Sequence, residues 1–224
     1  GIERKAYWLM KELVRLGHEV TLIGHARSDV SAIGARLIPH DFKTGGDWRK
    51  KIPSGTDVVH LFATPSEDPG VPYLVSVEGN GKQGETFHPN TVFLSRKHAE
   101  NHSSSVFVYN GIDLEEYPFV KKIGKGWGRF LFLAKASWKV KNLKDCVRAC
   151  RRAKKHLEVA GGRYWGISRY IHSHGMVNQE QKIALLQNCD ALLWPVRWHE
   201  PFGIAMIEAF AMGLPLVASG YGSM

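Results

Sequence analysis

The feature of this sequence that most constrains its fold is the regular alternation of short apolar runs with stretches of helical periodicity. Residues 3–16 place apolar side chains at helical spacing, Gly17 follows, and residues 18–24 then read as a strand. Because most of the later strands are continuously apolar, both faces of the sheet that they form must be covered. The pattern therefore predicts an α/β fold in which helices cover both faces of parallel sheets.

The same alternation locates the individual elements. The helical pattern covers residues 3–16, 95–102, 141–155, 178–189 and 201–213, with Ser95 as the cap of the second helix. The strand pattern covers residues 18–24, 57–63, 72–77, 90–95, 105–110, 129–134, 156–162, 170–177, 190–196 and 214–219.

The strand and helix pattern restarts near residue 120, in a stretch rich in glycine and lysine. We therefore expect two domains, residues 1–118 and 119–224, each a doubly wound parallel sheet, with a cleft between them. A doubly wound domain usually opens with a strand, whereas here Gly1 leads directly into a helix, and the chain stops just after a strand. We accordingly expect that sequence is missing at both ends.

Charge and cysteine content narrow the class of protein. The net charge is +9, and residues 121–169 carry fifteen lysines and arginines against two carboxylates. That density favours an anionic partner such as phosphate, nucleic acid or a membrane face, although a solvated basic helix is an equal alternative for residues 147–156. Three cysteines cannot all pair in disulfide bonds, and their number indicates reduced, buried thiols in a cytosolic protein. No apolar run approaches the length of a membrane span.

Glu208 is the only charged residue in the helix expected from Phe202 to Met212, and its helical neighbours are apolar. An ionised carboxylate on an apolar helix is costly unless something pairs with it. Three interpretations stay open. Glu208 faces solvent on a partly exposed helix, pairs with an internal lysine or arginine, or accepts hydrogen bonds from a polar ligand.

A second glutamate, Glu200, precedes Pro201 and should therefore lie outside the helix, with Pro201 as the first helical residue. Eight residues of helix rise about 12 Å, so the carboxylates of Glu200 and Glu208 are expected on a similar side at about that separation. The helix start between them has free N–H groups and Gly203, which suits phosphate. A sugar nucleotide has hydroxyls at both ends and a diphosphate between them, and it would fit.

The loop after the strand at residues 129–134 supplies cations for such a diphosphate. Lys135, Lys139 and Lys141 follow this strand within seven residues. The carboxyl ends of parallel strands are where open α/β sheets bind ligands. We therefore interpret the three lysines as a phosphate-binding group, with an ordinary solvated loop as the alternative.

Residues 199–219, HEPFGIAMIEAFAMGLPLVAS, resemble the signature of glycosyltransferase family 4, which comprises retaining enzymes of the GT-B fold. Residues 1–24, 108–117 and 131–143 resemble further segments of that family in the same order, and the resemblance covers nearly the whole chain. It implies two Rossmann-like domains, an acceptor side in residues 1–118 and a donor side in residues 119–224, with the family's first strand and the end of its second domain missing. The signature positions are Glu200, Pro201, Phe202, Gly203, Glu208, Gly213 and Pro215.

The resemblance also implies an activity. The enzyme would be of the hexosyltransferase type and would act in glycan biosynthesis. It would transfer a sugar from a UDP-, GDP- or ADP-linked donor to an unknown sugar, glycan or lipid-linked acceptor, with retention of the anomeric configuration. Transfer in this fold needs no metal and no bound cofactor, so cations and the helix end must stabilise the leaving diphosphate. The expected location is the cytoplasm, with peripheral contact at the inner face of the membrane as an option, and nucleic acid is not an expected partner.

Individual roles follow from the resemblance. Glu208 would bind the ribose, and Glu200 would hold the hydroxyls of the donor sugar beside Pro201 and the amides of Phe202 and Gly203. The remaining roles are implied for Lys135 and Lys141 on the diphosphate, Gly175 and Met176 at the base, and Gly1 in the turn near the phosphates. The catalytic candidates are Glu200, Lys141, Lys135 and Glu78.

Two positions depart from the family pattern. Lys135 stands where the family has an arginine, so the bidentate contact that a guanidinium group makes is lost. The spacing from Lys135 to Lys141 is slightly longer than in the family, so Lys139 is a further candidate. Glu78, Gly79 and Asn80 stand on the acceptor side where many relatives have His-Gly-Asn. Glu78 is therefore either an altered polar contact near the reacting centre or a sign of changed activity.

Two rival functions remain. A dinucleotide-dependent oxidoreductase would share the α/β architecture, but it should show a G-x-G-x-x-G turn that leads from a strand directly into a helix. Residues 79–84, GNGKQG, have this spacing after a strand, but the next element expected is the strand at residues 90–95 and not a helix. A catalytically silent sugar-nucleotide-binding protein of the same fold would retain both glutamates, and the Glu78 departure favours it. Nucleic-acid binding would leave Glu200 and Glu208 without a purpose.

Overall fold

The computed structural model describes residues 1–81, 84–119 and 126–223, and the chain divides into two compact units. The first unit consists of residues 1–94 and 105–110, and the second consists of residues 95–104 and 111–224. The structure thus changes unit at Asn110, and it gives the segment 95–104 to the second unit. The sequence had placed a single boundary after residue 118, within the chain segment that leads to residues 120–125, which lie outside the described part.

The first unit contains one long helix and two small parallel sheets. Helix α1 (Ile2–Arg15) is followed by β1 (Thr21–Gly24) and β2 (Arg36–Pro39), which pair with each other. The second sheet has the strand order β3 (Val59–Leu61), β4 (Tyr73–Ser76) and β5 (Thr91–Val92). All of these strand pairs are parallel, as the continuous apolar pattern predicts.

Two strand assignments in this unit differ from the sequence-based expectation. Residues 105–110 form no strand and contribute only an isolated bridge between Phe93 and Phe107. Val106 and Val108 are exposed, so this run gains no burial that would extend the bridge into a strand. Strand β2 was not expected, because its four residues include only two consecutive apolar side chains in a short run between turns.

The second unit contains a five-stranded parallel sheet with the order β10-β9-β6-β7-β8. These strands are β6 (Arg129–Leu133), β7 (His156–Ala160), β8 (Ile171–Gly175), β9 (Ala191–Trp194) and β10 (Leu216–Ala218). The chain adds β7 and β8 on one side of β6 and then β9 and β10 on the other side. Because right-handed crossovers are the rule, the connecting helices must lie on opposite faces, which makes the sheet doubly wound.

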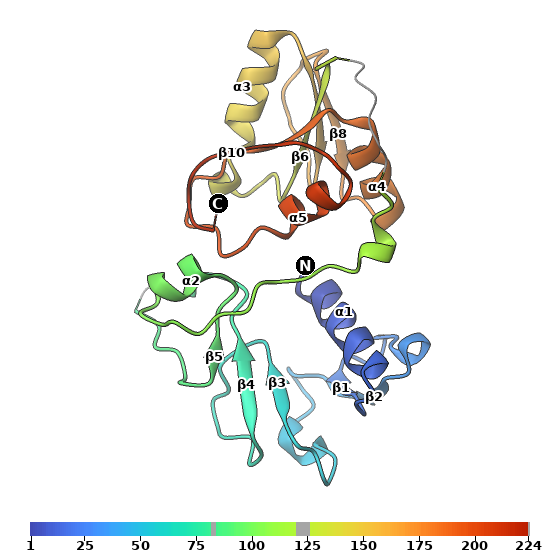
Figure 1. Ribbon diagram of the computed structural model, residues 1–224, viewed down its shortest axis with the longest axis vertical. Coiled ribbons are helices and arrows are strands. Elements are labelled where there is room, and N and C mark those ends of the chain that lie inside the picture. The colour runs from blue at the N-terminus through green and yellow to red at the C-terminus, as the bar shows by residue number, and fades with distance from the viewer. Residues whose placement is uncertain (82–83, 120–125, 224) are drawn as a thin grey trace. The chain divides into compact units, whose positions relative to one another are not determined.

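Helices α3 (Leu143–Ala153), α4 (Gln179–Asn188) and α5 (Ile204–Ala211) connect these strands, and α3 and α4 flank the sheet on opposite sides (Figure 1). Asn178 caps α4 through a capping box with Gln181, which satisfies two free N–H groups. The short helix α2 (Arg96–Asn101) begins at Ser95, whose hydroxyl accepts a hydrogen bond from His98 N at 3.0 Å, as predicted. The core between α3 and the sheet consists of Phe132, Leu143, Cys146, Val147, Cys150, Leu157 and Val159.

Buried cysteines confirm part of the sequence analysis. Cys146, Cys150 and Cys189 are all free and buried. Burial raises the pKa of Cys146 far above its usual range and raises the pKa of Cys150 to about 11. These thiols therefore act as small apolar residues of the core.

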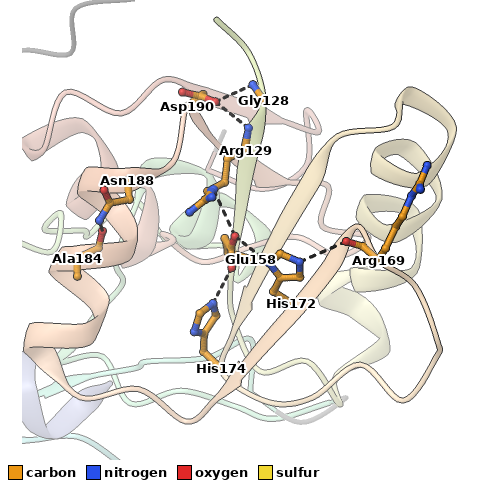
Figure 2. A network of polar contacts seen from close by, with 9 residues as sticks. All are labelled: Gly128, Arg129, Glu158, Arg169, His172, His174, Ala184, Asn188 and Asp190. Atoms are coloured by element: carbon orange, nitrogen blue, oxygen red, sulfur yellow. Dashed lines mark hydrogen bonds and ion pairs between the residues drawn. The ribbon is translucent and has the colours of Figure 1, made fainter. Parts of the chain in front are cut away.

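One buried carboxylate in the sheet is satisfied by a polar network (Figure 2). Glu158 on β7 accepts a 2.7 Å hydrogen bond from His174 Nε2, and His172 Nδ1 and Arg129 Nε lie 3.4 and 3.5 Å from its other oxygen. At the start of β6, Asp190 accepts hydrogen bonds from the backbone N–H groups of Gly128 and Arg129. The network thus compensates the charge of a carboxylate that is buried within the sheet.

The start of α5 differs from the expectation. The helix begins at Ile204, and Gly203 is its N-cap with φ of 86°, so Pro201 and Phe202 are not helical. The carbonyls of Pro201 and Phe202 accept hydrogen bonds from the side chains of Ser95 and Ser223, at 2.7 and 2.8 Å. These carbonyls are therefore unavailable to begin the helix, and the prediction of Pro201 as the first helical residue was wrong.

Candidate functional site

Two loops at the carboxyl end of the five-stranded sheet bring the predicted donor residues Lys141 and Glu200 together. Strands β6 and β9 are neighbours and run parallel, so the loops that follow them emerge side by side. The loop after β6 carries Lys135, Lys139 and Lys141, and the loop after β9 carries Glu200. A 2.7 Å hydrogen bond from Arg197 N to Val140 O ties the two loops together.

Lys141 and Glu200 form a buried ion pair. Lys141 Nζ lies 2.5 Å from Glu200 Oε2, and both residues are buried. The indole N–H of Trp198 donates to the same oxygen at 2.6 Å. Both contacts fall on Oε2, and among the described residues none donates a hydrogen bond to Oε1. The arrangement fixes the carboxylate while leaving one of its oxygens as an acceptor.

Aromatic rings hold the lysine of this pair. Lys141 Nζ lies 4.9 Å from the ring centroid of Trp194 and 4.9 Å from that of Trp198. A cation over an aromatic face is stabilised by the ring quadrupole, and the effect is larger where water is excluded. From the sequence, packing or a place in a pocket wall is the simplest expectation for both tryptophans. The structure gives them a further role, because they orient the Lys141 ammonium.

The backbone near Lys141 explains why the loop turns there. Asn142 adopts the left-handed conformation, with φ of 60°, and directly precedes α3. Its side-chain amide donates to Asp145 Oδ2 and to Pro195 O, both at 2.8 Å. Asparagine tolerates this conformation better than most residues, and its amide here also joins the loop to the end of β9.

The segment from Glu200 to Gly203 is held from several sides. Ser223 N donates to Glu200 O at 3.0 Å, and a side chain at Gly222 would meet the Glu200 backbone nitrogen at 2.2 Å. A side chain at Gly203, in turn, would meet the methyl group of Met206 at 2.4 Å. The segment therefore requires glycine at two points of close approach, and the free N–H groups of α5 begin directly after it.

Glu208 is the centre of a second buried cluster. Its Oε1 lies 2.5 Å from Lys182 Nζ and accepts a 2.6 Å hydrogen bond from the hydroxyl of Tyr117. Lys182 also donates to the Tyr117 hydroxyl at 3.0 Å. Burial and the neighbouring Glu208 charge raise the pKa of Tyr117 well above its usual range, so the phenol remains a donor. No described residue donates to Glu208 Oε2.

This cluster decides between the interpretations of Glu208. The residue is 6% exposed, so the interpretation as a solvent-facing helix residue was wrong. Pairing with an internal cation occurs, through Lys182. The interpretation as a ligand acceptor is compatible with this pairing, because the second carboxylate oxygen is not used within the described part of the chain. The expected separation of about 12 Å from Glu200 rested on a helix that starts at Pro201, and this premise does not hold.

The other predicted donor residues make no hydrogen bond or ion pair with these two pairs within the described part of the chain. Lys135 and Lys139 are exposed, and Lys135 Nζ lies 5.0 Å from the ring centroid of Trp138. Gly175 ends β8, and its carbonyl accepts hydrogen bonds from the N–H groups of Gly161 and Gly162. Met176 follows and is 83% exposed, so its side chain is available for a contact with a ligand.

Gly1, predicted for the turn near the donor phosphates, and the predicted acceptor-side residues belong to the first unit. Gly1 is the N-cap of α1, and Glu78, Gly79 and Asn80 follow β4. Glu78 is paired with Lys5 of α1, and both side chains are largely buried. Lys5 Nζ also lies 5.9 Å from the Phe62 ring centroid.

A histidine lies near this pair. His60 Nε2 is 2.7 Å from Ser76 Oγ, on adjacent strands of the same sheet. Burial and the charge of Lys5 lower the pKa of His60. The neutral ring therefore persists to lower pH than usual, as expected for a histidine whose ring is satisfied by a hydrogen bond within the sheet.

Sequence reasoning missed Lys182, Tyr117 and Lys5, the partners of the predicted carboxylates. Tyr117 and Glu208 are 91 positions apart, so no local pattern relates them. Lys182 and Lys5 each stand on a helix that carries several other polar residues. The one available signal was the buried carboxylate itself, which requires a cation without indicating which one.

The described residues contain neither a metal-binding group nor a membrane-spanning helix. No group of three or more His, Cys, Asp or Glu side chains in that part of the chain is arranged to hold a metal ion. Among the same residues, no helix combines the length and the apolar character that crossing a membrane requires.

Known proteins share both the sequence pattern and the fold. The family described as Glycosyl transferases group 1 matches residues 113–224. Glycogen synthases of two strains of Mycobacterium tuberculosis are 28% identical over 134 residues, which covers 52% of this chain and 32% of theirs. The chain thus spans about a third of the length of these curated relatives.

Three solved structures illustrate the shared fold. AviGT4, a glycosyltransferase involved in avilamycin A biosynthesis, has 22% identity and a TM-score of 0.75 over 96% of this chain and 69% of its own. HepE of Anabaena, in complex with UDP-glucose, has 11% identity and a TM-score of 0.72 over 98% and 78%. Sucrose-phosphate synthase of Thermosynechococcus elongatus has 13% identity and a TM-score of 0.68 over 96% and 74%. The expected fold class, α/β with Rossmann-like parallel sheets of the GT-B kind, is confirmed.

Proposed function

The chain belongs to the Glycosyl transferases group 1 family, and from this premise we propose that it is a retaining glycosyltransferase of the family 4 type. It is of the hexosyltransferase type and transfers a sugar from a nucleoside diphosphate to an acceptor. The bond between the sugar C1 and the β-phosphate oxygen breaks, and a new bond from C1 to an acceptor hydroxyl forms on the same face. The acceptor proton and the nucleoside diphosphate are the other products.

The observation that carries this proposal is the pair of buried, lysine-paired carboxylates on either side of the α5 start. Glu200 is paired with Lys141 before the helix, and Glu208 is paired with Lys182 within it. A sugar nucleotide presents hydroxyls at two ends and two phosphates between them. The two carboxylates provide acceptors for the two sets of hydroxyls, and the free N–H groups at the helix start suit a phosphate.

Glu208 is assigned to the ribose. Its Oε1 is fixed by Lys182 and Tyr117, and its Oε2 accepts from no described residue. A ribose hydroxyl donating to this oxygen makes a charge-assisted hydrogen bond, roughly twice as strong as a neutral one. Gly175 and the exposed Met176 are assigned to the base, since Met176 offers an adaptable apolar contact.

Glu200 is assigned to the donor sugar, with Pro201 and the amides of Phe202 and Gly203 beside it. Trp198 and Lys141 fix Oε2, and Oε1 is the oxygen that a sugar hydroxyl would reach. Rigid placement of a carboxylate near the anomeric carbon orients the sugar before transfer, which lowers the barrier by removing unproductive geometries.

Lys141, Lys135 and Lys139 are assigned to the diphosphate. Negative charge grows on the β-phosphate as the bond to C1 breaks, and a fixed cation in a water-poor site stabilises that charge most effectively. Lys141 is buried and held by two rings, whereas Lys135 and Lys139 are exposed. Lys141 therefore contributes most, and the reaction proceeds without a metal ion in this proposal.

The acceptor side is assigned to residues 1–118, with residues 119–224 as the donor side. Glu78, Gly79 and Asn80 follow β4, and Gly1 lies at the start of α1 in the same unit. The Lys5 contact neutralises Glu78, so that the pair presents polar groups with no net charge. We propose that this pair contacts the sugar, glycan or lipid-linked acceptor in the position that a histidine occupies in many relatives.

A UDP-linked sugar is the first donor to test, because HepE was solved with UDP-glucose. GDP- and ADP-linked sugars remain the alternatives. A second candidate function is a catalytically silent sugar-nucleotide-binding protein. Two departures from the family pattern favour it, namely Glu78 in place of histidine and Lys135 in place of an arginine that would make a bidentate contact.

The deciding experiment is a thermal-shift screen against UDP-, GDP- and ADP-linked sugars, first without metal and then with magnesium. Stabilisation by one of them without metal supports the donor site and identifies the base. Release of free nucleotide in that mixture then separates an enzyme from a silent binder. An absence of stabilisation by every donor, with and without magnesium, would overturn the proposed function.

A further inference from the structure

A basic groove runs along α3 on the second unit. It has a volume of about 900 Å³ and is formed by the loop after β6, one side of α3 and the loop after β7. Six cationic residues line it, namely Lys139, Lys144, Arg148, Arg151, Arg163 and Arg197. All six are exposed, so their charges face the groove or the solvent around it.

The positive charge of this groove is poorly compensated. Asp145 is the carboxylate that pairs with its lining, 3.4 Å from Arg148 Nη1 and 2.6 Å from Arg197 Nη2. Over residues 1–81, 84–119 and 126–223, the structure shows no carboxylate partner for Lys144, Arg151 or Arg163. A concentration of like charges on one surface creates a field that attracts an anionic partner.

Apolar side chains project from the loop that borders the same groove. Trp165 lines the groove and is 88% exposed, and Ile167, two residues later, is fully exposed. Arg163 and Arg169 flank them in the sequence. A large aliphatic side chain that is exposed to water is stabilised only if another apolar phase covers it.

The base of this loop is held firmly. Tyr164 packs against the core beside α3, and its backbone N–H donates to Ser173 Oγ at 3.0 Å. Gly162 forms a bridge with Gly175, and a side chain at Gly166 would collide with the Tyr164 hydroxyl at 2.1 Å. The exposure of Trp165 and Ile167 is therefore built into the loop, because its anchored residues direct the tip outward.

We propose that this groove and the loop 163–169 dock the protein onto an anionic phospholipid bilayer. The lipid phosphates would meet the arginines and lysines along α3, and Trp165 and Ile167 would enter the interface. Tryptophan favours the level of the headgroups, and basic clusters bind anionic leaflets. A soluble polyanion or a single-stranded nucleic acid would use the same cations and stack on Trp165, but it offers no apolar phase for Ile167.

The docking surface adjoins the proposed donor site at Lys139, which lines the groove and is also assigned to the diphosphate, but the residues altered in the test lie outside that site. None of Lys144, Arg151, Trp165 and Ile167 contacts Lys141, Glu200 or Glu208 in the described contacts. Membrane docking would bring the enzyme close to a lipid-linked acceptor, but it does not depend on the chemistry of transfer. Its test can therefore succeed or fail independently of the proposed function.

The test is co-sedimentation of the full chain with vesicles made of equal parts of phosphatidylglycerol and phosphatidylcholine. Pure phosphatidylcholine vesicles are the comparison. We expect binding to the anionic vesicles only, weakened at about 1 M salt because the Debye length then falls to about 3 Å. The charge variant Lys144→Glu with Arg151→Glu and the apolar variant Trp165→Ser with Ile167→Ser should each reduce the bound fraction at least tenfold.

Matched controls separate docking from general effects. Arg27→Glu with Lys43→Glu changes the same charge on exposed residues of the first unit, and Leu16→Ser removes an apolar side chain that is 63% exposed. Both controls should bind vesicles like the unaltered chain, and thermal unfolding should show that every variant is folded. Absence of binding to anionic vesicles, or equal losses in the controls, would overturn the proposal, as would tighter binding to a single-stranded oligonucleotide or soluble polyphosphate than to vesicles.

Discussion

Three carboxylates of the second unit are buried to a similar degree, but their surroundings differ. Glu158, Glu200 and Glu208 are 4%, 7% and 6% exposed. Glu200 and Glu208 each have one lysine and one aromatic donor, both converging on a single oxygen. Glu158 has contacts to both of its oxygens, from two histidines and an arginine (Figure 2).

This difference shows that burial alone does not identify a binding carboxylate. Glu158 lies within β7, where its neighbours on β6 and β8 can satisfy both oxygens. Glu200 follows the carboxyl end of β9, and Glu208 lies on the helix after that loop, where ligands bind in open α/β sheets. A carboxylate at the carboxyl end of the sheet with one oxygen that no protein group contacts is available to a ligand. A carboxylate with protein contacts to both oxygens is structural.

The largest effect is expected at Lys141. Lys141→Ala should lower the transfer rate by roughly a hundredfold to a thousandfold, because it removes the buried cation that stabilises the leaving diphosphate. It should also weaken binding of UDP far more than binding of uridine, as isothermal calorimetry would show. Equal losses for the two ligands would exclude a role at the phosphates.

Lys139→Ala serves as the matched control for that change. Lys139 lies in the same loop but is exposed, so its loss should reduce the rate much less than the loss of Lys141. Lys141→Ala also leaves Glu200 buried without its cation, which should lower the free energy of unfolding by about 3 kcal/mol. The rate should therefore be measured well below the melting temperature of the variant.

Glu208→Gln is expected to have the second largest effect. Replacing the carboxylate by an amide removes a charge-assisted hydrogen bond worth about 1.5–3 kcal/mol, so the dissociation constant for the nucleotide should rise roughly tenfold to a hundredfold. Titration calorimetry on the folded variant measures this. Glu180→Gln, at an exposed position on α4, should leave the affinity unchanged, and a Glu208 variant with unaltered affinity would show that its pairing is purely structural.

Glu158→Gln should affect stability and leave the donor site intact. The side chains that contact it, Arg129, His172 and His174, are more than a third exposed, at 51%, 46% and 38%, so solvent screening limits the loss of unfolding free energy to about 1 kcal/mol. Urea denaturation would measure the loss, with Glu12→Gln on the exposed side of α1 as the control. A marked fall in nucleotide affinity would mean that the contrast between Glu158 and the other two glutamates is false.

The smallest effect is expected at the buried thiols of α3. The pKa of Cys150 is raised to about 11 by burial, so a thiol reagent at pH 8 should label none of the three cysteines in the folded chain and all of them after unfolding. As the pH rises above the ordinary value of 9.0, the unfolded chain loses the Cys150 proton while the folded chain keeps it. The free energy of unfolding should therefore fall with pH between about 9 and 11. Rapid labelling of the native chain would contradict this.

Much of the second unit was predictable from local patterns. Strands β7 and β9 are buried at all but one position each, and the central residues Leu131 and Phe132 of β6 are buried, which is typical of parallel strands covered on both faces. Glu208 was identifiable because one charge on an apolar helix requires compensation. The first unit was less predictable, since the four-residue strand β2 was not expected and the strand expected over residues 105–110 is only an isolated bridge.

The sequence by itself determined which groups must be compensated, and it placed Lys141 and Glu200 on loops that meet at one sheet edge. It did not determine that α5 begins at Ile204, because the carbonyls of Pro201 and Phe202 are taken by Ser95 and Ser223, which are remote in the chain. Only the tertiary structure decided that Lys182 and Tyr117 are the partners of Glu208. The reason is that periodicity records which side of an element is apolar, whereas a buried charge is satisfied by whichever donor the packing of distant elements brings within hydrogen-bond distance.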